Sequence, residues 1–182
     1  MTSGHGFSRW MRIVTILALP FAIVSAGSIP GLTETDPGPS DNFPAPVVNL
    51  SPLDGELFAL ADLQGRVVVL DFWATWCHAC VVDLPQVIDT VNEFADDQVA
   101  LWTINRMESD DTIKEFMRDE DLEFPVSTDR DSAISKAFKV MVIPHLVVID
   151  REGVVRHVHV GRELDGKDYL KKEIEALLDD AV

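Results

Sequence analysis

Apolar residues recur along this chain with two different periods, which predict strands that alternate with helices. Short apolar runs rich in β-branched residues predict buried strands at 67–70, 99–104, 146–149 and 154–160. Apolar residues spaced three or four apart predict helices at about 78–95, 110–120, 132–138 and 167–179. Strands that alternate with helices and end in a hairpin and a helix predict an α/β fold around a mixed central sheet.

Polar residues with a strong local preference mark several ends of these elements. Ser109 is a favourable N-cap for the helix that begins at 110, and Asp165 is a candidate cap for the last helix. Two apolar stretches, 47–50 and 56–60, flank the turn-like sequence Ser51-Pro-Leu-Asp-Gly55. This arrangement predicts a short hairpin before the first central strand.

The N-terminal region has a different composition from the rest. Arg9 and Arg12 precede an apolar run at 13–24, which is shorter than a membrane-spanning helix and is interrupted by Pro20. Small residues follow at 25–27, which is typical of a cleavage site. We therefore expect a signal peptide or signal anchor at 1–27, a flexible linker rich in proline and glycine at 28–44, and one domain at 45–182.

The chain is acidic, with 31 aspartate and glutamate residues against 15 lysine and arginine residues and a formal net charge of −16. A surface of this sign repels nucleic acid and anionic lipid. Nucleic-acid binding is therefore not expected, and the charge indicates a solvated acidic coat rather than a particular chemistry.

The only two cysteines, Cys77 and Cys80, fall between a predicted strand and a predicted helix. Unpaired backbone N–H groups and the helix macrodipole favour a thiolate at the start of a helix, so we expect a lowered pKa for Cys77. Cys80 lies within one turn of it and is placed to attack a mixed disulfide formed at Cys77. The pair therefore predicts dithiol–disulfide exchange. The alternatives are a structural disulfide without redox activity and half of the ligand set of a zinc site.

The sequence around this pair resembles the active-site signature of thioredoxin-fold proteins. The resemblance is carried by Asp71-Phe-Trp-Ala-Thr-Trp-Cys-His-Ala-Cys80. With Gly65-Arg-Val-Val-Val-Leu70 before it and Asp83-Leu-Pro85 after it, the stretch is most similar to the TlpA/ResA branch of exported thiol–disulfide oxidoreductases. The resemblance covers about 45–180 and implies a thioredoxin fold with an added N-terminal hairpin.

The resemblance also implies roles for individual residues. Asp71 matches an aspartate that assists proton transfer at the second cysteine. Glu108 falls where ResA-type proteins place an active-site glutamate, so it is a second candidate for handling protons. Pro144 matches a cis-proline that faces the cysteines, so that the backbone of Ile143 can pair with an extended client, and Trp76 belongs to the rim that binds substrate. The alternatives are a water-bonded structural carboxylate at Asp71 and a solvated loop residue at Glu108.

Several histidines depart from the family pattern or are candidate metal ligands. His78 lies between the cysteines, and as an imidazolium it would stabilise the Cys77 thiolate and make the protein more oxidising, unless it is a solvent-exposed bystander. His145 stands where threonine is usual. His157 and His159 share one face of a predicted strand, where a solvated pair is the more frequent arrangement than a metal site.

The family resemblance implies protein thiol or disulfide clients, apo-cytochrome c among them, and a membrane thiol–disulfide electron donor. We expect no cofactor and no bound metal. A DsbA-like oxidant is the nearest rival, although the stretch 96–144 is too short for the helical domain that such proteins insert.

Two further classes use related motifs. A redoxin-type peroxidase would need threonine three residues before its cysteine, and that position is Ala74. A Sco-like copper-handling protein would use a CxxxC pair and a distant histidine; the spacing here is one residue shorter, and the corresponding ligands would be Cys77, Cys80 and His145.

Overall fold

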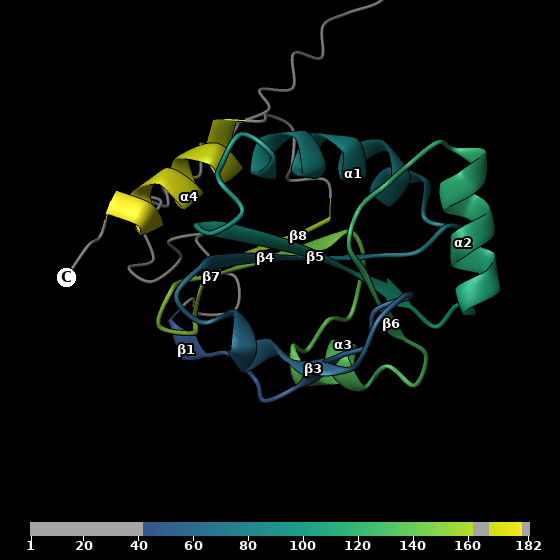
Figure 1. Cartoon of the computed structure of the whole chain (residues 1–182), viewed down its shortest axis with the longest axis horizontal. Coiled ribbons are helices and arrows are strands. Elements are labelled where there is room, and N and C mark those ends of the chain that lie inside the picture. The colour runs from purple at the N-terminus through teal and green to yellow at the C-terminus, as the bar shows by residue number, and fades with distance from the viewer. Residues whose placement is uncertain (1–41, 162–167, 180–182) are drawn as a thin grey trace, which may run out of the picture. The chain divides into compact units, whose positions relative to one another are not determined.

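A six-stranded mixed sheet forms the centre of the computed structural model, which describes residues 42–161 and 168–179 (Figure 1). Its strands are β1 (Phe43–Pro44), β4 (Val67–Trp73), β5 (Val99–Arg106), β6 (Val126–Asp129), β7 (His145–Ile149) and β8 (Val154–Val160). Their order in the sheet is β1-β8-β7-β4-β5-β6. The strands β4, β5 and β6 are parallel, whereas β7, β8 and β1 pair antiparallel, so the predicted mixed sheet is confirmed.

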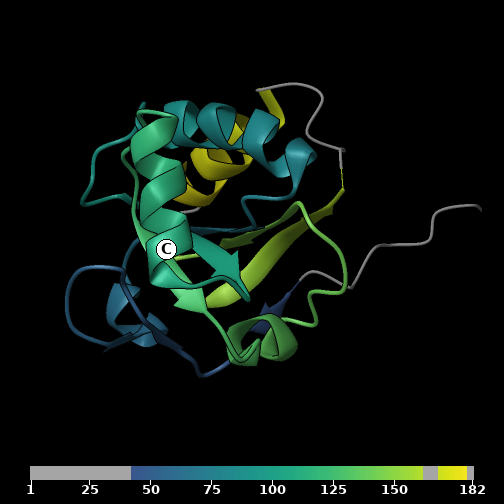
Figure 2. The same ribbon diagram turned by 90° about the vertical axis from the view of Figure 1, so that its right-hand side faces the viewer.

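Helices cover both faces of this sheet. They are α1 (His78–Val91), α2 (Asp110–Asp119), α3 (Ala133–Ala137) and α4 (Asp168–Asp179). Figures 1 and 2 show α1 and α4 on one face and α3 on the other. The α1 helix ends four residues earlier than predicted, because the N–H groups of Glu93 and Phe94 bond to carbonyls three residues back and tighten the chain into a turn.

The central strand β4 is buried along its whole length and contributes side chains to the hydrophobic core on each face of the sheet. Val68, Leu70 and Phe72 pack on the α3 side. Val67 and Val69 pack on the opposite side, against α1 and α4. Because successive side chains of a strand alternate between faces, Asp71 lies on the α1 side together with Val69. The alternation therefore directs a carboxylate toward α1, the helix that contains Cys80.

The predicted hairpin is present, although its strands are shorter than expected. β2 (Asn49–Leu50) pairs antiparallel with β3 (Phe58–Ala59), and a 3₁₀ helix, η1 (Leu60–Leu63), follows. The turn between them reaches the outer side of β6, where the Leu53 N–H bonds to the Val126 carbonyl and the Thr128 N–H bonds to the Ser51 carbonyl.

The N-terminal border of the domain lies earlier than expected. Phe43 and Pro44 were assigned to the linker, but they form β1 and pair with Val155 and Val154 of β8. The pairing was missed because a two-residue strand that contains proline has no detectable period.

Other predictions concern chain ends. Ser109 caps α2 as predicted, since its Oγ accepts a hydrogen bond from the Thr112 N–H at 3.2 Å. The proposed cap Asp165, the signal segment 1–27 and residues 28–41 of the linker lie outside the described residues. Among the described residues, no helix combines the length and the apolar character that crossing a membrane requires.

Candidate active site

Cys77 lies at the junction between β4 and α1, as the sequence predicts. After β4 ends at Trp73, a turn is closed by a hydrogen bond from the Cys77 N–H to the Ala74 carbonyl at 3.0 Å. Cys77 is the N-cap residue of α1, and its Sγ accepts a hydrogen bond from the Cys80 N–H at 3.2 Å. The sulfur therefore occupies the position at which a helix stabilises negative charge.

Cys77 and Cys80 are joined by a disulfide, with their Cα atoms 5.3 Å apart. Cys77 is 8% exposed and Cys80 is 2% exposed. Both pack in one apolar cluster with Trp73, Leu84 and Ile113. Cys77 is thus the more accessible half of the pair, and Cys80 is held inside the protein.

Two buried carboxylates lie between β4 and α1. Asp71 is 2% exposed and Asp83 is 8% exposed. Burial, and secondarily the negative charge of Asp83, raise the pKa of Asp71 to about 7. A carboxyl group with this pKa exchanges a proton near neutral pH.

Asp83 was not among the predicted site residues. It follows Cys80 by three residues, and residues three apart lie on the same side of a helix. A carboxylate within an apolar helix face, next to the buried Leu84, is the signal that could have identified it.

Glu108 lies in the loop between β5 and α2, where its carboxylate contacts the active-site turn. Its oxygens accept hydrogen bonds from the Thr75 N–H (2.8 Å), the Thr75 hydroxyl (2.5 Å) and the Asn105 side-chain amide (2.8 Å). The structure thus places Glu108 beside the loop that precedes Cys77. The participation of Thr75 and Asn105 was missed, because Thr75 has no role of its own in the signature 71–80 and its contact with the end of β5 depends on tertiary packing.

The peptide bond between Ile143 and Pro144 is cis. Ile143 is partly buried and packs against the apolar cluster that contains both cysteines. Three large apolar side chains of the surrounding loops are exposed: Trp76, Met141 and Val142. Trp76 was predicted at this rim, whereas Met141 and Val142 were not, because exposure of single apolar residues in a loop leaves no pattern in the sequence.

His78 is the first residue of α1 and is exposed to solvent. Its imidazole is therefore adjacent in sequence to Cys77 but is not held in the apolar cluster. This position agrees with the sequence expectation and leaves its proposed effect on the thiolate as a prediction.

His145 lies on the other face of the sheet from the cysteines. It is 4% exposed, its ring packs edge-on against Phe72 with centroids 5.8 Å apart, and neither ring nitrogen has a hydrogen-bond partner in the protein. Burial, followed by the charges of Arg106 and His159, lowers the pKa of His145 to about 4, so the ring is neutral at pH 7. The structure therefore does not bring together the three ligands of the copper alternative.

His157 and His159 face α4, where both contact Glu173. The nitrogen–oxygen distances are 3.5 Å from His157 Nδ1 and 2.9 Å from His159 Nε2, and the two rings are stacked with centroids 6.5 Å apart. Both side chains are partly buried rather than simply solvated. Over residues 42–161 and 168–179, no group of three or more histidine, cysteine or acidic side chains is arranged to hold a metal ion.

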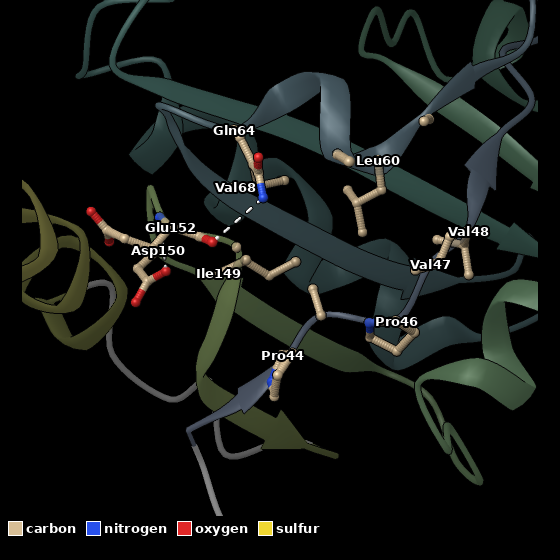
Figure 3. Close-up of a pocket in the computed structure, with 14 residues that line it drawn as sticks. Pro44, Pro46, Val47, Val48, Leu60, Gln64, Val68, Ile149, Asp150 and Glu152 are labelled. Carbon is tan, nitrogen blue, oxygen red and sulfur yellow. Dashed lines mark hydrogen bonds between the residues drawn. The ribbon is translucent and has the colours of Figure 1, made fainter.

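A pocket of about 230 Å³ lies away from these residues (Figure 3). Pro44 to Val48, η1 and the strands β4 and β7 surround it, and Val68 and Ile149 contribute from the sheet face opposite α1. On its rim the Gln64 amide donates a hydrogen bond to the Glu152 carbonyl at 3.5 Å (Figure 3). None of the residues predicted to act in catalysis lines this pocket.

Comparisons with known proteins agree with this geometry. The model of the AhpC/TSA family matches residues 42–158. The chain is 34% identical over 138 residues to the thioredoxin-like protein YneN of Bacillus subtilis, covering 74% of this chain and 76% of that protein. It is 31% identical over 130 residues to the thiol–disulfide oxidoreductase ResA of Bacillus thuringiensis subsp. konkukian, covering 70% and 75% of the two chains.

A solved structure shares the fold. The crystal structure of a putative thiol:disulfide interchange protein DsbE from Chlorobium tepidum superimposes with a TM-score of 0.69 at 28% identity. The match covers 76% of this chain and 98% of that one. The predicted thioredoxin fold and the predicted dithiol–disulfide chemistry are thus confirmed.

Proposed function

The chain belongs to the AhpC/TSA family and is a thiol–disulfide oxidoreductase of the TlpA/ResA type, and from this premise we propose that it is an exported reductant of protein disulfides. The observation that carries the proposal is the Cys77–Cys80 pair at the N-terminus of α1, in which Cys77 is the N-cap and the more accessible of two largely buried cysteines. Such an arrangement separates a nucleophile from a resolving thiol.

In the proposed reaction, the Cys77 thiolate attacks a client disulfide. One sulfur of the client leaves as a thiolate, and a mixed disulfide forms between Cys77 and the other. Cys80, once deprotonated, attacks the Cys77 sulfur, releases the client and closes the disulfide seen in the structure. Two electrons pass to the client, which takes up two protons, and an external thiol–disulfide donor restores the dithiol.

Asp71 accepts the proton that Cys80 loses. The carboxylate is buried on the α1 side of β4, and its pKa of about 7 allows it to take up and release a proton near neutral pH. Asp83 contributes by its charge, which helps to keep the proton affinity of Asp71 high. Because their charges interact, the two carboxylates would take up and release protons as a coupled pair.

The client binds across the cis-proline loop. The backbone of Ile143 pairs with an extended segment of the client, and Pro144 fixes the loop opposite the cysteines. Trp76, Met141 and Val142 expose apolar surface on which client side chains can pack. An unfolded or partly folded protein offers both the extended backbone and the apolar side chains that this surface requires.

Residues 1–27 support export, since basic residues precede an apolar run and small residues. A redox-active pair is suited to a compartment in which client thiols become oxidised. By resemblance to TlpA/ResA proteins, the clients are exported thiol proteins such as apo-cytochrome c, and the electron donor is a membrane thiol–disulfide protein. Cell fractionation would test this localisation, since an exported protein should be recovered from the extracytoplasmic fraction.

The reduction potential of the Cys77–Cys80 couple tests the proposed direction. A reductant should equilibrate with glutathione buffers near the value of about −270 mV that is typical of thioredoxin, far from the value of about −120 mV of a strong oxidant. Equilibration of the purified protein in such buffers, read by the fraction of free thiol, gives the potential. A value near that of the strong oxidant would reject the reductant and favour the DsbA-like alternative.

The residue that favours the oxidant alternative is His78, and His78→Pro measures its influence. An imidazolium next to Cys77 stabilises the thiolate and hence the reduced state, so its removal should make the couple more reducing, where each ~30 mV corresponds to about 1.4 kcal/mol. The difference should be larger at acid pH than in alkali, because only a protonated imidazole carries the charge that acts on the thiolate. A variant that is equally or more oxidising at acid pH would make His78 a bystander.

A further inference from the structure

Three polar side chains join the active-site turn to the end of β5. They are Thr75 in the turn, Asn105 in β5 and Glu108 in the loop that follows β5. We propose that this cluster, here called the turn clamp, positions Cys77, and that Glu108 acts through Thr75 rather than by carrying protons. The proposal deepens the proposed function, because it rests on Cys77 being the nucleophile.

Every partner of the Glu108 carboxylate is a donor. One oxygen, Oε2, accepts hydrogen bonds from the Thr75 N–H and the Asn105 amide, both at 2.8 Å, and Oε1 accepts one from the Thr75 hydroxyl at 2.5 Å. Three donors on two oxygens fix the position and orientation of the carboxylate. A group held in this way serves as a fixed anchor better than as a proton carrier.

The anchor is fixed on its other side by the sheet. Asn105 is completely buried and lies in register between Trp73 of β4 and Thr128 of β6. The residue before Glu108, Met107, donates its N–H to the Asp129 carbonyl at 3.2 Å. The residue after it is Ser109, the N-cap of α2. The position of Glu108 is therefore determined by β5, β6 and α2 and not by the active-site turn.

Thr75 transmits this position to the nucleophile. It lies within the four-residue turn from Ala74 to Cys77, which the Cys77 N–H closes. In the oxidised protein the disulfide also restrains Cys77. Reduction removes that covalent restraint, so the turn clamp matters most in the reduced protein, the state that attacks a client. A displacement of a reacting atom by about 1 Å can lower a rate by about 10²-fold.

Conservative and disruptive substitutions of Glu108 distinguish positioning from proton transfer. The assay is the rate of insulin disulfide reduction by the full-length protein across a range of pH. Glu108→Gln should keep at least half of the wild-type rate, because its amide oxygen can accept both N–H groups and its NH₂ can donate to the Thr75 hydroxyl. Glu108→Ala should lose about 10-fold or more at every pH, within the range expected for a misplaced nucleophile.

Two further variants complete the test. Thr75→Val keeps the backbone donor but loses the hydroxyl, so it should lose less activity than Glu108→Ala, and the double variant should be no slower than Glu108→Ala alone. Glu120→Ala, which removes an exposed carboxylate at the end of α2, controls for the change in net charge and should match wild type. All variants should keep the shape of the wild-type pH profile.

The proposal is overturned if Glu108→Gln is as slow as Glu108→Ala, or if its pH profile lacks an inflection that the wild type shows. Either result would show that activity requires an ionisable group at Glu108 and would favour a role for Glu108 in proton transfer. A wild-type protein that fails to reduce insulin would instead contradict the proposed reductant, whereas the turn clamp is judged only from the ratio of variant to wild-type rates.

Discussion

Cys80→Ser should remain covalently attached to a disulfide-bonded client through Cys77, whereas Cys77→Ser should capture none. A mixed disulfide accumulates only when the nucleophile has reacted and the resolving thiol is missing. The structure supports this order, since Cys77 is the more exposed cysteine and caps α1. Incubation of each reduced variant with a disulfide-bonded peptide, followed by mass measurement without reductant, should show the adduct for Cys80→Ser alone.

Serine is a suitable replacement at both positions. At Cys77 it preserves an N-cap acceptor for α1, whereas alanine would also remove the cap and cost about 1 kcal/mol of stability. Both variants lose the same disulfide, so a difference between them cannot come from that bond. Equal adduct formation by the two variants would contradict the assignment of nucleophile and resolving cysteine.

Asp71→Asn should slow the reduction of a model disulfide and at the same time stabilise the oxidised protein. The folded carboxyl has a pKa of about 7, against 3.8 for the unfolded chain, so between these values the unfolded state releases a proton that the folded state keeps. The stability of the wild type therefore falls as pH rises through this window, by about 4 kcal/mol in total. Asparagine cannot ionise and escapes this loss.

The measurement is chemical denaturation of both proteins at several pH values, with the disulfide intact. The difference in unfolding free energy should grow from pH 4 to pH 7 and be constant above it. Burying an amide adds an offset that does not depend on pH, so the slope is the diagnostic quantity. Asp83→Asn should lower the upper end of this window, because the charge of Asp83 is the second cause of the raised pKa of Asp71, whereas the lower end is set by the unfolded chain. If the unfolding free energies of wild type and Asp71→Asn depend on pH in the same way, Asp71 does not have the raised pKa described above. If Asp71→Asn reduces the model disulfide at the wild-type rate, Asp71 has a structural role only.

Local pattern was sufficient to predict most of the fold. The apolar runs of β4, β5, β7 and β8 and the N-cap at Ser109 are each signalled within a few residues. The structure has all of them within three residues of the predicted borders. The junction at Cys77 was predictable for the same reason, since a change of period from two to 3.6 marks the place where a strand gives way to a helix.

Contacts between distant segments were not predictable. Glu108 was identified by resemblance, but its bonds to Thr75 cross 33 residues and depend on how the β5–α2 loop returns to the turn. In the same way, the burial of His145 between Phe72 and the α3 side of the sheet has no counterpart in the local sequence. Side chains that meet through tertiary packing leave no period along the chain.

The contact between the hairpin turn and β6 has a consequence for a protein that handles unfolded clients. A strand at the border of a sheet presents unpaired N–H and C=O groups, which act as a template for another chain and so for aggregation. Ser51 and Leu53 bond to the outer side of β6, and the Ser51 N–H also bonds to the Ser127 hydroxyl at 2.9 Å. Extended client segments therefore meet a β6 template that is already occupied by the protein's own chain. Unproductive pairing at β6 is thereby suppressed, and the loop at Ile143 and Pro144, where we propose that the client binds, does not compete with β6 for the same segment.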